Sequence, residues 1–471
     1  QNRMQKLHKP SHWDRNLESE ESVMPLIGSV ADDLTGATTT GVLLARSKAR
    51  TAVFFNVEAA MKAEGVDELD AIIISSNSRP LPANEAYDKV KDATIALKSM
   101  GAKYFQKRID TTMRGGIGVE IDAMLDQLSE DTVAVVVPAM PQSRRILVGG
   151  YSVIDGVALI NTPVAQDVRT PVKENYIPRL LEGQTRRKVG LVTLDKVLAG
   201  DEAIKEALAK ERADGCQVIV VDAITLEDVE NIAQACISLN WNVVSVDPGP
   251  FTSKLAYYRD IIGVEEPNLP PQGDETGKTV LIAAGSATPV TKRQMEILCQ
   301  DERHVRISVE PIPLIDGGEA ALDEVYKAVN KAVALMKAPV PPRAILFETA
   351  LHGELLNLDE EDAKRHYAGG MSANRINAGL GAIIQQVLEV VGKDKVAGLY
   401  TTGGDTMVNV CYQLGVECIE VLDYVIPQTD IGRLIGSPYS GLPVVGKGGL
   451  TGNDNTACDI VTRLFNEAAR K

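Results

Sequence analysis

The chain has 471 residues, more than one ordinary domain, so we expect two or three domains with well-buried cores. Its net charge is −15 at neutral pH, which disfavours nucleic-acid and anionic-membrane partners because both require a basic surface. No apolar run reaches the length of a bilayer span, and the six cysteines form no Cys-x-x-Cys pair. We therefore expect a cytoplasmic protein with reduced thiols.

Short β-branched runs alternate with helical patterns along the chain. After a polar arm at 1–24, apolar runs predict strands at residues 26–30, 71–75, 104–109, 133–137, 189–193, 218–221 and 243–246. A stretch rich in proline and glycine then interrupts the pattern at 264–274. Beyond it, strands are predicted at 279–283, 305–309, 344–347, 396–400 and 442–445, and helices from about 290, over 319–336, over 372–391 and from 454.

This alternation predicts parallel sheets with crossover helices. We expect an α/β protein with two domains, each a mainly parallel sheet flanked by helices. The expected boundaries are a flexible polar arm at 1–24, a first domain at 25–263, a linker or hinge at 264–276 and a second domain at 277–471.

Two adjacent carboxylates, Asp32 and Asp33, follow the first predicted strand. Ligands of open α/β sheets bind outside the carboxyl ends of strands, where an acidic pair can orient hydroxyls or accept a proton. Aspartate is also common at the N-cap and in the first turn of helices. Helix capping is therefore the simpler explanation when the pair is considered alone.

Two further segments of the first half carry cations just after predicted strands. The segment 107–118 combines basic, acidic and hydroxyl side chains with glycines: Lys107, Arg108, Asp110, Thr111, Thr112 and Arg114. Such a turn can hold a small carboxylate or phosphate, although a solvated turn with an internal Arg–Asp pair explains it equally well. Arg79 can grip a carboxylate bidentately, but turn chemistry accounts for its neighbours. In a parallel sheet all three segments would lie on one edge.

Glycine loops follow three strands of the second half. They contain Ser286, then Gly403, Gly404, Asp405 and Thr406, and finally Lys447, Gly448 and Gly449. A strand, a glycine turn and a helix start can present backbone N–H groups to phosphate, yet many α/β proteins carry such turns without a ligand. The last loop nearly matches the P-loop motif, but Gly448 occupies the position where Ser or Thr would bind magnesium. No Gly-x-Gly-x-x-Gly occurs, which disfavours a dehydrogenase.

The ordered set of motifs resembles the four-carbon acid sugar kinases. The resemblance runs from about residue 26 to the C-terminus and is carried by residues 31–37, 107–115, 138–141, 284–286, 403–406 and 447–452. It implies a first domain that binds the sugar acid and a second that binds ATP with Mg²⁺, whose ligands stay unknown. The expected reaction phosphorylates the terminal C4 hydroxyl, with D-threonate as the first choice of substrate. D-Erythronate, L-threonate and 3-oxo-tetronate are alternatives, and a non-catalytic sugar-acid sensor is the alternative of another class.

The resemblance also implies roles for individual residues. The substrate residues would be Asp32, Asp33, Arg79, Lys107, Arg108, Ile109, Asp110 and Arg114. Asp33 and then Asp110 are the candidates for the catalytic aspartate, while Arg79, Lys107 and Arg108 would hold the substrate carboxylate. The nucleotide residues would be Ser286, Gly403, Gly404, Asp405, Thr406, Lys447 and Gly449. A homodimer is compatible with a cytosolic enzyme of this size.

Overall fold

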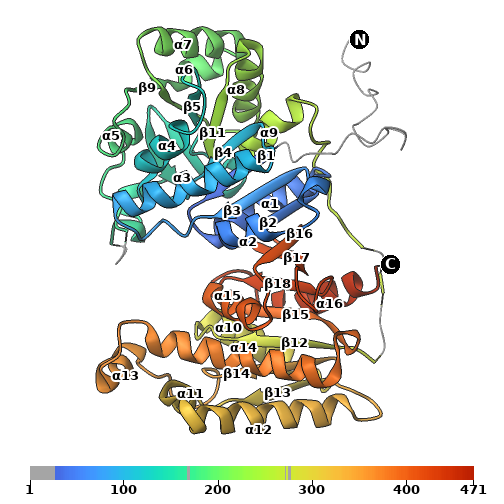
Figure 1. The fold of residues 1–471 in the computed structure, drawn as a ribbon. Helices are drawn as coiled ribbons and strands as arrows, with labels where there is room; N and C mark the ends of the chain where they lie inside the picture. Colours follow the sequence, from blue (N-terminus) through green and yellow to red (C-terminus); the bar gives the residue numbers. More distant parts are fainter. Residues whose placement is uncertain (1–26, 167–169, 271, 274–276, 471) are drawn as a thin grey trace. The chain divides into compact units, whose positions relative to one another are not determined.

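The computed structural model describes residues 27–166, 170–270, 272–273 and 277–470. The chain forms two compact units, Gln1–Pro267 and Asn268–Lys471 (Figure 1). The division between the units falls inside the stretch 264–276 that we expected to be a linker. The polar arm predicted for 1–24 lies outside the described residues.

The first unit contains a parallel sheet in the order β2-β3-β1-β4-β11-β5-β10-β9. Its strands are β1 (Ile27–Ala31), β2 (Thr51–Phe54), β3 (Ala71–Ser75), β4 (Tyr104–Arg108), β5 (Val133–Val136), β9 (Val189–Val192), β10 (Val218–Val221) and β11 (Val243–Asp247). A second, antiparallel sheet joins β6 (Arg145–Val148), β7 (Tyr151–Ile154) and β8 (Val157–Ala158).

Helices connect the strands of the first unit. They are α1 (Leu34–Arg46), α2 (Val57–Lys62), α3 (Ala83–Ser99), α4 (Ile117–Leu125), α5 (Ile177–Glu182), α6 (Leu194–Leu198), α7 (Asp201–Ala213), α8 (Leu226–Leu239) and α9 (Pro250–Tyr258). Short 3-10 turns lie at Val66–Glu68, Pro141–Ser143, Leu159–Asn161 and Pro163–Gln166.

The second unit contains a mainly parallel sheet in the order β13-β14-β12-β15-β18-β17-β16. Its strands are β12 (Thr279–Ala284), β13 (His304–Ser308), β14 (Ala344–Glu348), β15 (Val396–Thr402), β16 (Cys418–Ile426), β17 (Thr429–Ile435) and β18 (Pro443–Lys447). β17 pairs antiparallel with both β16 and β18, whereas the other pairs are parallel. The helices are α10 (Pro289–Leu298), α11 (Pro311–Asp316), α12 (Gly318–Met336), α13 (Leu358–Arg365), α14 (Met371–Val391), α15 (Gly404–Gln413) and α16 (Thr456–Ala468), with a 3-10 turn at Lys393–Lys395.

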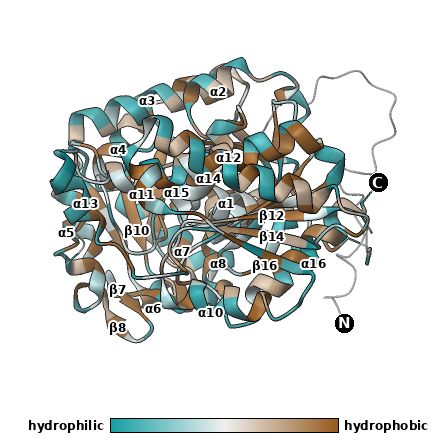
Figure 2. Cartoon of the chain, turned by 90° about the horizontal axis from the view of Figure 1, so that it is seen from below, coloured by the Kyte–Doolittle hydropathy of each residue, from teal (hydrophilic) through white to brown (hydrophobic). Residues whose placement is uncertain are grey.

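Each unit has its own hydrophobic core. Strands such as β1, β3, β10 and β14 are buried along their whole length, as expected for parallel strands that are covered on both faces. Figure 2 shows this pattern as brown strands inside the molecule and teal, hydrophilic residues on helices. The fold prediction of two α/β units with mainly parallel sheets is confirmed.

All six cysteines are free thiols, and four of them, Cys216, Cys236, Cys411 and Cys418, are buried. Within the described part of the chain, no helix is both long enough and apolar enough to cross a bilayer.

Strand order places the predicted site segments together within each unit. β1 lies between β3 and β4 and runs parallel to both, so the turns after these three strands share one edge of the first sheet. β15 likewise lies between β12 and β18, so the three glycine loops share one edge of the second sheet. The sheets thus assemble two separate clusters from segments that are far apart in the sequence.

Candidate functional site

The acidic pair after β1 divides into one buried and one accessible carboxylate. The side chain of Asp32 is 2% exposed, whereas that of Asp33 is 30% exposed. Asp33 is the N-cap of α1 and accepts a 2.8 Å hydrogen bond from the N–H of Gly36. The capping explanation is therefore correct for Asp33, and its exposure leaves the same carboxylate within reach of a ligand.

Two arginines neutralise the acidic pair. Arg79 binds Asp32 bidentately, with Nε–Oδ2 at 2.7 Å and Nη2–Oδ1 at 3.1 Å, and its Nη1 lies 2.7 Å from Asp33 Oδ2. Arg108 Nη1 lies 3.4 Å from Asp33 Oδ1 and 3.8 Å from Asp32 Oδ1. Burial alone would raise the pKa of Asp32, but the positive charges of Lys107 and Arg79 outweigh it and hold the pKa below its usual value.

Lys107 takes a different place from the one we predicted. Its side chain is fully buried, and its ammonium lies 2.7 Å from Glu120 Oε2 and donates to the carbonyl of Arg108. Ile109 is also a core residue, because its side chain is buried and its N–H bonds the carbonyl of Asp247. The structure thus pairs Lys107 with Glu120, and the expected contact of Lys107 with a substrate carboxylate stays a prediction. Ile109 offers a ligand neither its side chain nor its N–H.

Asp110 belongs to the same cluster, and its side chain is largely buried. It accepts from Arg114 Nε at 2.6 Å and from the hydroxyl of Thr112. Burial would raise the pKa of Asp110, but Arg79 and Arg114 outweigh it and keep the pKa well below its usual range. The internal Arg–Asp pair that we considered as an alternative is therefore present, and it fixes Asp110 as an ionised carboxylate.

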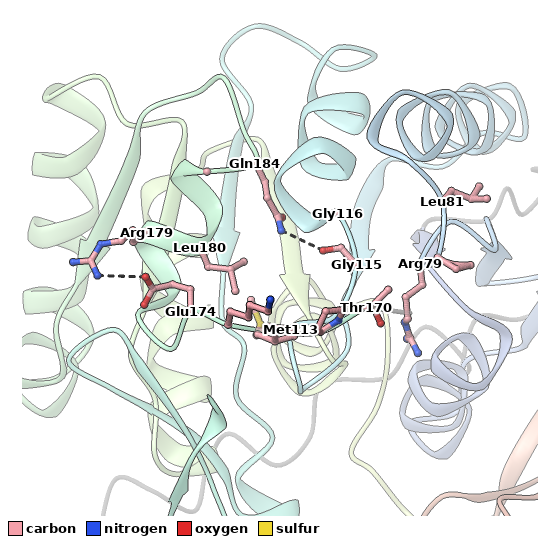
Figure 3. Close-up of a pocket in the computed structure, with 15 residues that line it drawn as sticks. Arg79, Leu81, Met113, Gly115, Gly116, Thr170, Glu174, Arg179, Leu180 and Gln184 are labelled. Atoms are coloured by element: carbon pink, nitrogen blue, oxygen red, sulfur yellow. Dashed lines mark hydrogen bonds and ion pairs between the residues drawn. The ribbon is translucent and has the colours of Figure 1, made fainter. Parts of the chain in front are cut away.

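A cavity of about 500 Å³ opens beside Arg79 (Figure 3). Its wall includes Met113, Gly115 and Gly116 from the turn before α4, together with Lys173, Glu174, Arg179 and Gln184. Gln184 links its own side of the cavity wall to the turn before α4. Its amide nitrogen donates to the carbonyl of Gly115, and its amide oxygen accepts from the N–H of Gly118. Sequence reasoning found Arg79 but missed Lys173 and Gln184, since neither lies in a strand-to-helix turn.

The glycine loops of the second unit interlock closely. The N–H groups of Gly285 and Ser286 both bond the carbonyl of Thr402, and the N–H of Gly403 bonds the carbonyl of Lys447. The hydroxyl of Thr288 reaches the carbonyl of Gly449 at 2.5 Å. The predicted nucleotide residues from three loops are thus brought into one connected cluster.

Glycine is required sterically at two of these positions. A Cβ on Gly449 would lie 2.5 Å from Ser286 Oγ, and a Cβ on Gly285 would overlap Thr406 Oγ1 and lie 2.5 Å from Asn377 Oδ1. Gly403 has a φ of 104°, in the region that favours glycine, and it precedes α15, which starts with Gly404 and exposed Asp405. The backbone can therefore approach a ligand closely at this edge.

One buried cation and one buried amide complete the second cluster. Lys447 at the end of β18 donates to the carbonyl of Gly448 at 2.8 Å, and burial lowers its pKa to about 8. Asn377 of α14 accepts a 2.8 Å hydrogen bond from Thr406 Oγ1. Asn377 was missed because a single amide in a long amphipathic helix carries no local signal.

Both halves of the chain match known domain families. Residues 27–255 match a family model described as a sugar-binding N-terminal domain, and residues 281–457 match one described as a nucleotide-binding C-terminal domain. A sugar-binding domain followed by a nucleotide-binding domain defines a carbohydrate kinase. The chain belongs to the four-carbon acid sugar kinase family.

Curated relatives are similar over nearly the whole chain. A D-erythronate kinase of Heliobacterium modesticaldum is 37% identical across 94% of this chain and 98% of that protein. A D-threonate kinase of Salmonella typhimurium is 29% identical across 92% and 96%. A 3-oxo-tetronate kinase of Pseudomonas savastanoi is 27% identical across 87% and 92%.

Crystal structures show the same fold at lower identity. A Salmonella typhimurium protein superposes with a TM-score of 0.76 at 20% identity, covering 92% of this chain and 98% of that one. A Haemophilus influenzae protein gives 0.72 at 22% identity, covering 94% and 98%.

Proposed function

We propose that this kinase transfers the γ-phosphoryl group of ATP to the terminal C4 hydroxyl of a four-carbon sugar acid. The observation that carries the proposal is the difference in exposure between the two carboxylates at the end of β1. Asp32 is buried and holds Arg79, while Asp33 stays accessible beside the same guanidinium. An accessible carboxylate next to a fixed cation suits a substrate that carries a hydroxyl and a carboxylate.

The first unit supplies the groups that orient the acid. Arg79 receives the substrate carboxylate at the wall of the cavity, with Arg108 adding positive charge behind it. Asp33 orients the terminal hydroxyl and accepts its proton as the new bond to phosphorus forms. Asp110 keeps Arg114 in place at the rim and is the second candidate for the proton acceptor.

The second unit supplies donors for the triphosphate. The N–H groups of the loops at Ser286, Gly403 and Gly449, the start of α15 and the ammonium of Lys447 favour negative charge. Mg²⁺ requires few protein ligands when it is bound mainly through nucleotide phosphates and water. The exposed carboxylate of Asp405, in the first turn of α15, could serve as one such protein ligand. The metal would then neutralise phosphate charge at this loop.

We propose D-erythronate as the substrate, in preference to the D-threonate suggested by the motifs. Support comes from identity, which is 37% to the relative named D-erythronate kinase and 29% to that named D-threonate kinase, over similar spans. The two acids differ at one carbon, so their discrimination depends on which hydroxyls find partners in the site.

The test is a panel of four-carbon acids with ATP and Mg²⁺. The purified protein is incubated with D-erythronate, D-threonate, L-threonate and 3-oxo-tetronate, and ADP release and the mass of the product are measured. We expect D-erythronate to give the highest kcat/KM and a product phosphorylated at C4. Calorimetry with each acid is run in parallel, because binding of an acid without ADP release would support a sensor instead.

A further inference from the structure

A buried ion pair lies beneath the candidate sugar-acid site. Lys107 Nζ lies 2.7 Å from Glu120 Oε2, and the two side chains are 0% and 2% exposed. The other oxygen of Glu120 accepts a 2.6 Å hydrogen bond from Ser78, whose hydroxyl is 2.8 Å from that of Ser76. Helix α4 is thereby tied to strand β4 and to the turn that follows β3.

This pair connects directly to the groups that would bind the acid. Ser78 immediately precedes Arg79, and the N–H of Arg79 bonds the carbonyl of Asp32. The positive charge of Lys107, together with those of Arg79 and Arg108, outweighs the effect of burial and holds the pKa of Asp32 below its usual value. The ammonium of Lys107 is therefore attracted by two buried carboxylates, Glu120 and Asp32, and it bonds Glu120.

Helix α4 also carries a second buried ion pair that serves as a comparison. Asp122, two residues after Glu120, lies 2.5 Å from Arg187 and accepts from the hydroxyl of Thr185. Asp122 also accepts from the N–H of Arg186, and none of these three partners belongs to the cluster around Arg79. If buried carboxylates of α4 had only a structural role, substitutions of Glu120 and of Asp122 would have the same effect. Comparing the two substitutions therefore tests that explanation.

We propose that Glu120 is a positioning residue for the phosphorylation site, a role that rests on the proposed function. By holding Lys107 and Ser78, its carboxylate leaves Asp32 to bind Arg79 bidentately and so fixes the guanidinium that receives the sugar acid. When the charge of Glu120 is removed, Lys107 still attracts the carboxylate of Asp32. Asp32 is then drawn away from Arg79, and the acid loses a preorganised partner.

The experiment compares Glu120→Gln with the matched control Asp122→Asn in the full-length protein. Steady-state kinetics with ATP, Mg²⁺ and the best acid of the panel are measured with thermal unfolding. We expect Glu120→Gln to raise the KM for the acid about tenfold, with the KM for ATP within about twofold of wild type. Asp122→Asn should lower the melting temperature without changing either KM.

Two further variants keep the test decisive. Glu120→Asp retains the negative charge and should restore part of the acid affinity, and Ser78→Ala should raise the KM for the acid without removing a charge. If Glu120→Gln does not fold, these two variants still test whether Glu120 acts as a positioning residue. An unchanged KM for the acid in the folded Glu120 and Ser78 variants, or equal KM changes for ATP and acid, would overturn the role.

The outcome separates this role from the proposed function itself. If the wild-type protein phosphorylates none of the four acids, the proposed function fails and the role of Glu120 fails with it. If the wild type is active and Glu120→Gln matches it, only the positioning role is refuted.

Discussion

At the scale of single residues, Asp33 combines a structural role with the proposed chemical one. Its carboxylate caps α1 through the N–H of Gly36 and contacts Arg79 and Arg108 while staying 30% exposed. A capping residue has a fixed position, because the helix backbone holds it. The capping role that seemed to compete with function therefore supplies the preorganisation that a catalytic carboxylate needs.

The double role of Asp33 gives the first prediction. Asn is as good an N-cap as Asp, so Asp33→Asn should keep α1 capped while removing the proton acceptor and the charge that faces Arg79 and Arg108. We expect kcat to fall by about 100-fold or more, with nucleotide affinity unchanged. Stopped assays of ADP release and nucleotide calorimetry measure the two effects. Turnover near the wild-type level would remove Asp33 from the mechanism and leave Asp110 as the candidate.

A second prediction concerns Lys447, whose pKa burial lowers to about 8. Below that pH the ammonium is charged and can assist in binding the triphosphate; above it the neutral amine cannot. Nucleotide affinity should therefore fall as the pH rises through about 8. Titration calorimetry between pH 7 and pH 9 tests this, and Lys447→Met should bind nucleotide more weakly with little pH dependence. An equal pH dependence in Lys447→Met would assign the titration to another group.

At the scale of elements, the second site depends on how closely its loops pack. Thr288 and Thr291 donate to the carbonyl of Gly449. A Cβ on Gly449 would meet Ser286, and a Cβ on Gly285 would meet Thr406. The loops come from three neighbouring parallel strands, so their separation is set by the sheet. A single added methyl group at a contact point would therefore overlap side chains of the neighbouring segments.

The third prediction uses this packing. Gly285→Ala places a Cβ against Thr406 and Asn377, which should cost about 1–3 kcal/mol of stability and weaken nucleotide binding. Gly369→Ala is the matched control, because a Cβ at Gly369 meets nothing within 4 Å. Denaturant unfolding and nucleotide calorimetry of both variants provide the comparison. Unchanged nucleotide affinity in Gly285→Ala would refute the role of this loop.

Much of the parallel sheet can be predicted from the sequence. Strands buried on both faces are continuous apolar runs, so β3 and β10 were predicted with their observed bounds. The hairpin of β16 and β17 was not assigned, because partly exposed strands mix polar residues such as Glu420 and Asp430 among apolar ones. The pairing of Lys107 could not be predicted, because its buried partner, Glu120, lies on a helix and has no signature near the strand.

At the scale of the whole molecule, the chain consists of two units with separate cores and separate candidate sites. The family models follow the same division, one for sugar binding and one for nucleotide binding. A ligand stabilises the folded unit that binds it, by about 2.7 kcal/mol at 100 times its Kd. The two ligands should therefore act on different parts of the unfolding transition.

The fourth prediction follows for thermal unfolding. A nucleotide should raise the melting of the unit Asn268–Lys471, and the sugar acid should raise that of Gln1–Pro267. Differential scanning calorimetry with each ligand alone measures the shift in each melting temperature. The transition that Gly285→Ala lowers belongs to the second unit, because Gly285 lies there. If the nucleotide stabilises only the transition that Gly285→Ala leaves unchanged, the assignment of the two sites is wrong.

The free cysteines offer a way to follow each unit without an added probe. Cys216 and Cys236 are buried in the first unit, and Cys411 and Cys418 in the second. Burial raises the pKa of all four thiols, so they react slowly with alkylating reagents while the protein is folded. Pulse alkylation followed by peptide mass mapping would therefore time the opening of each unit in the native chain.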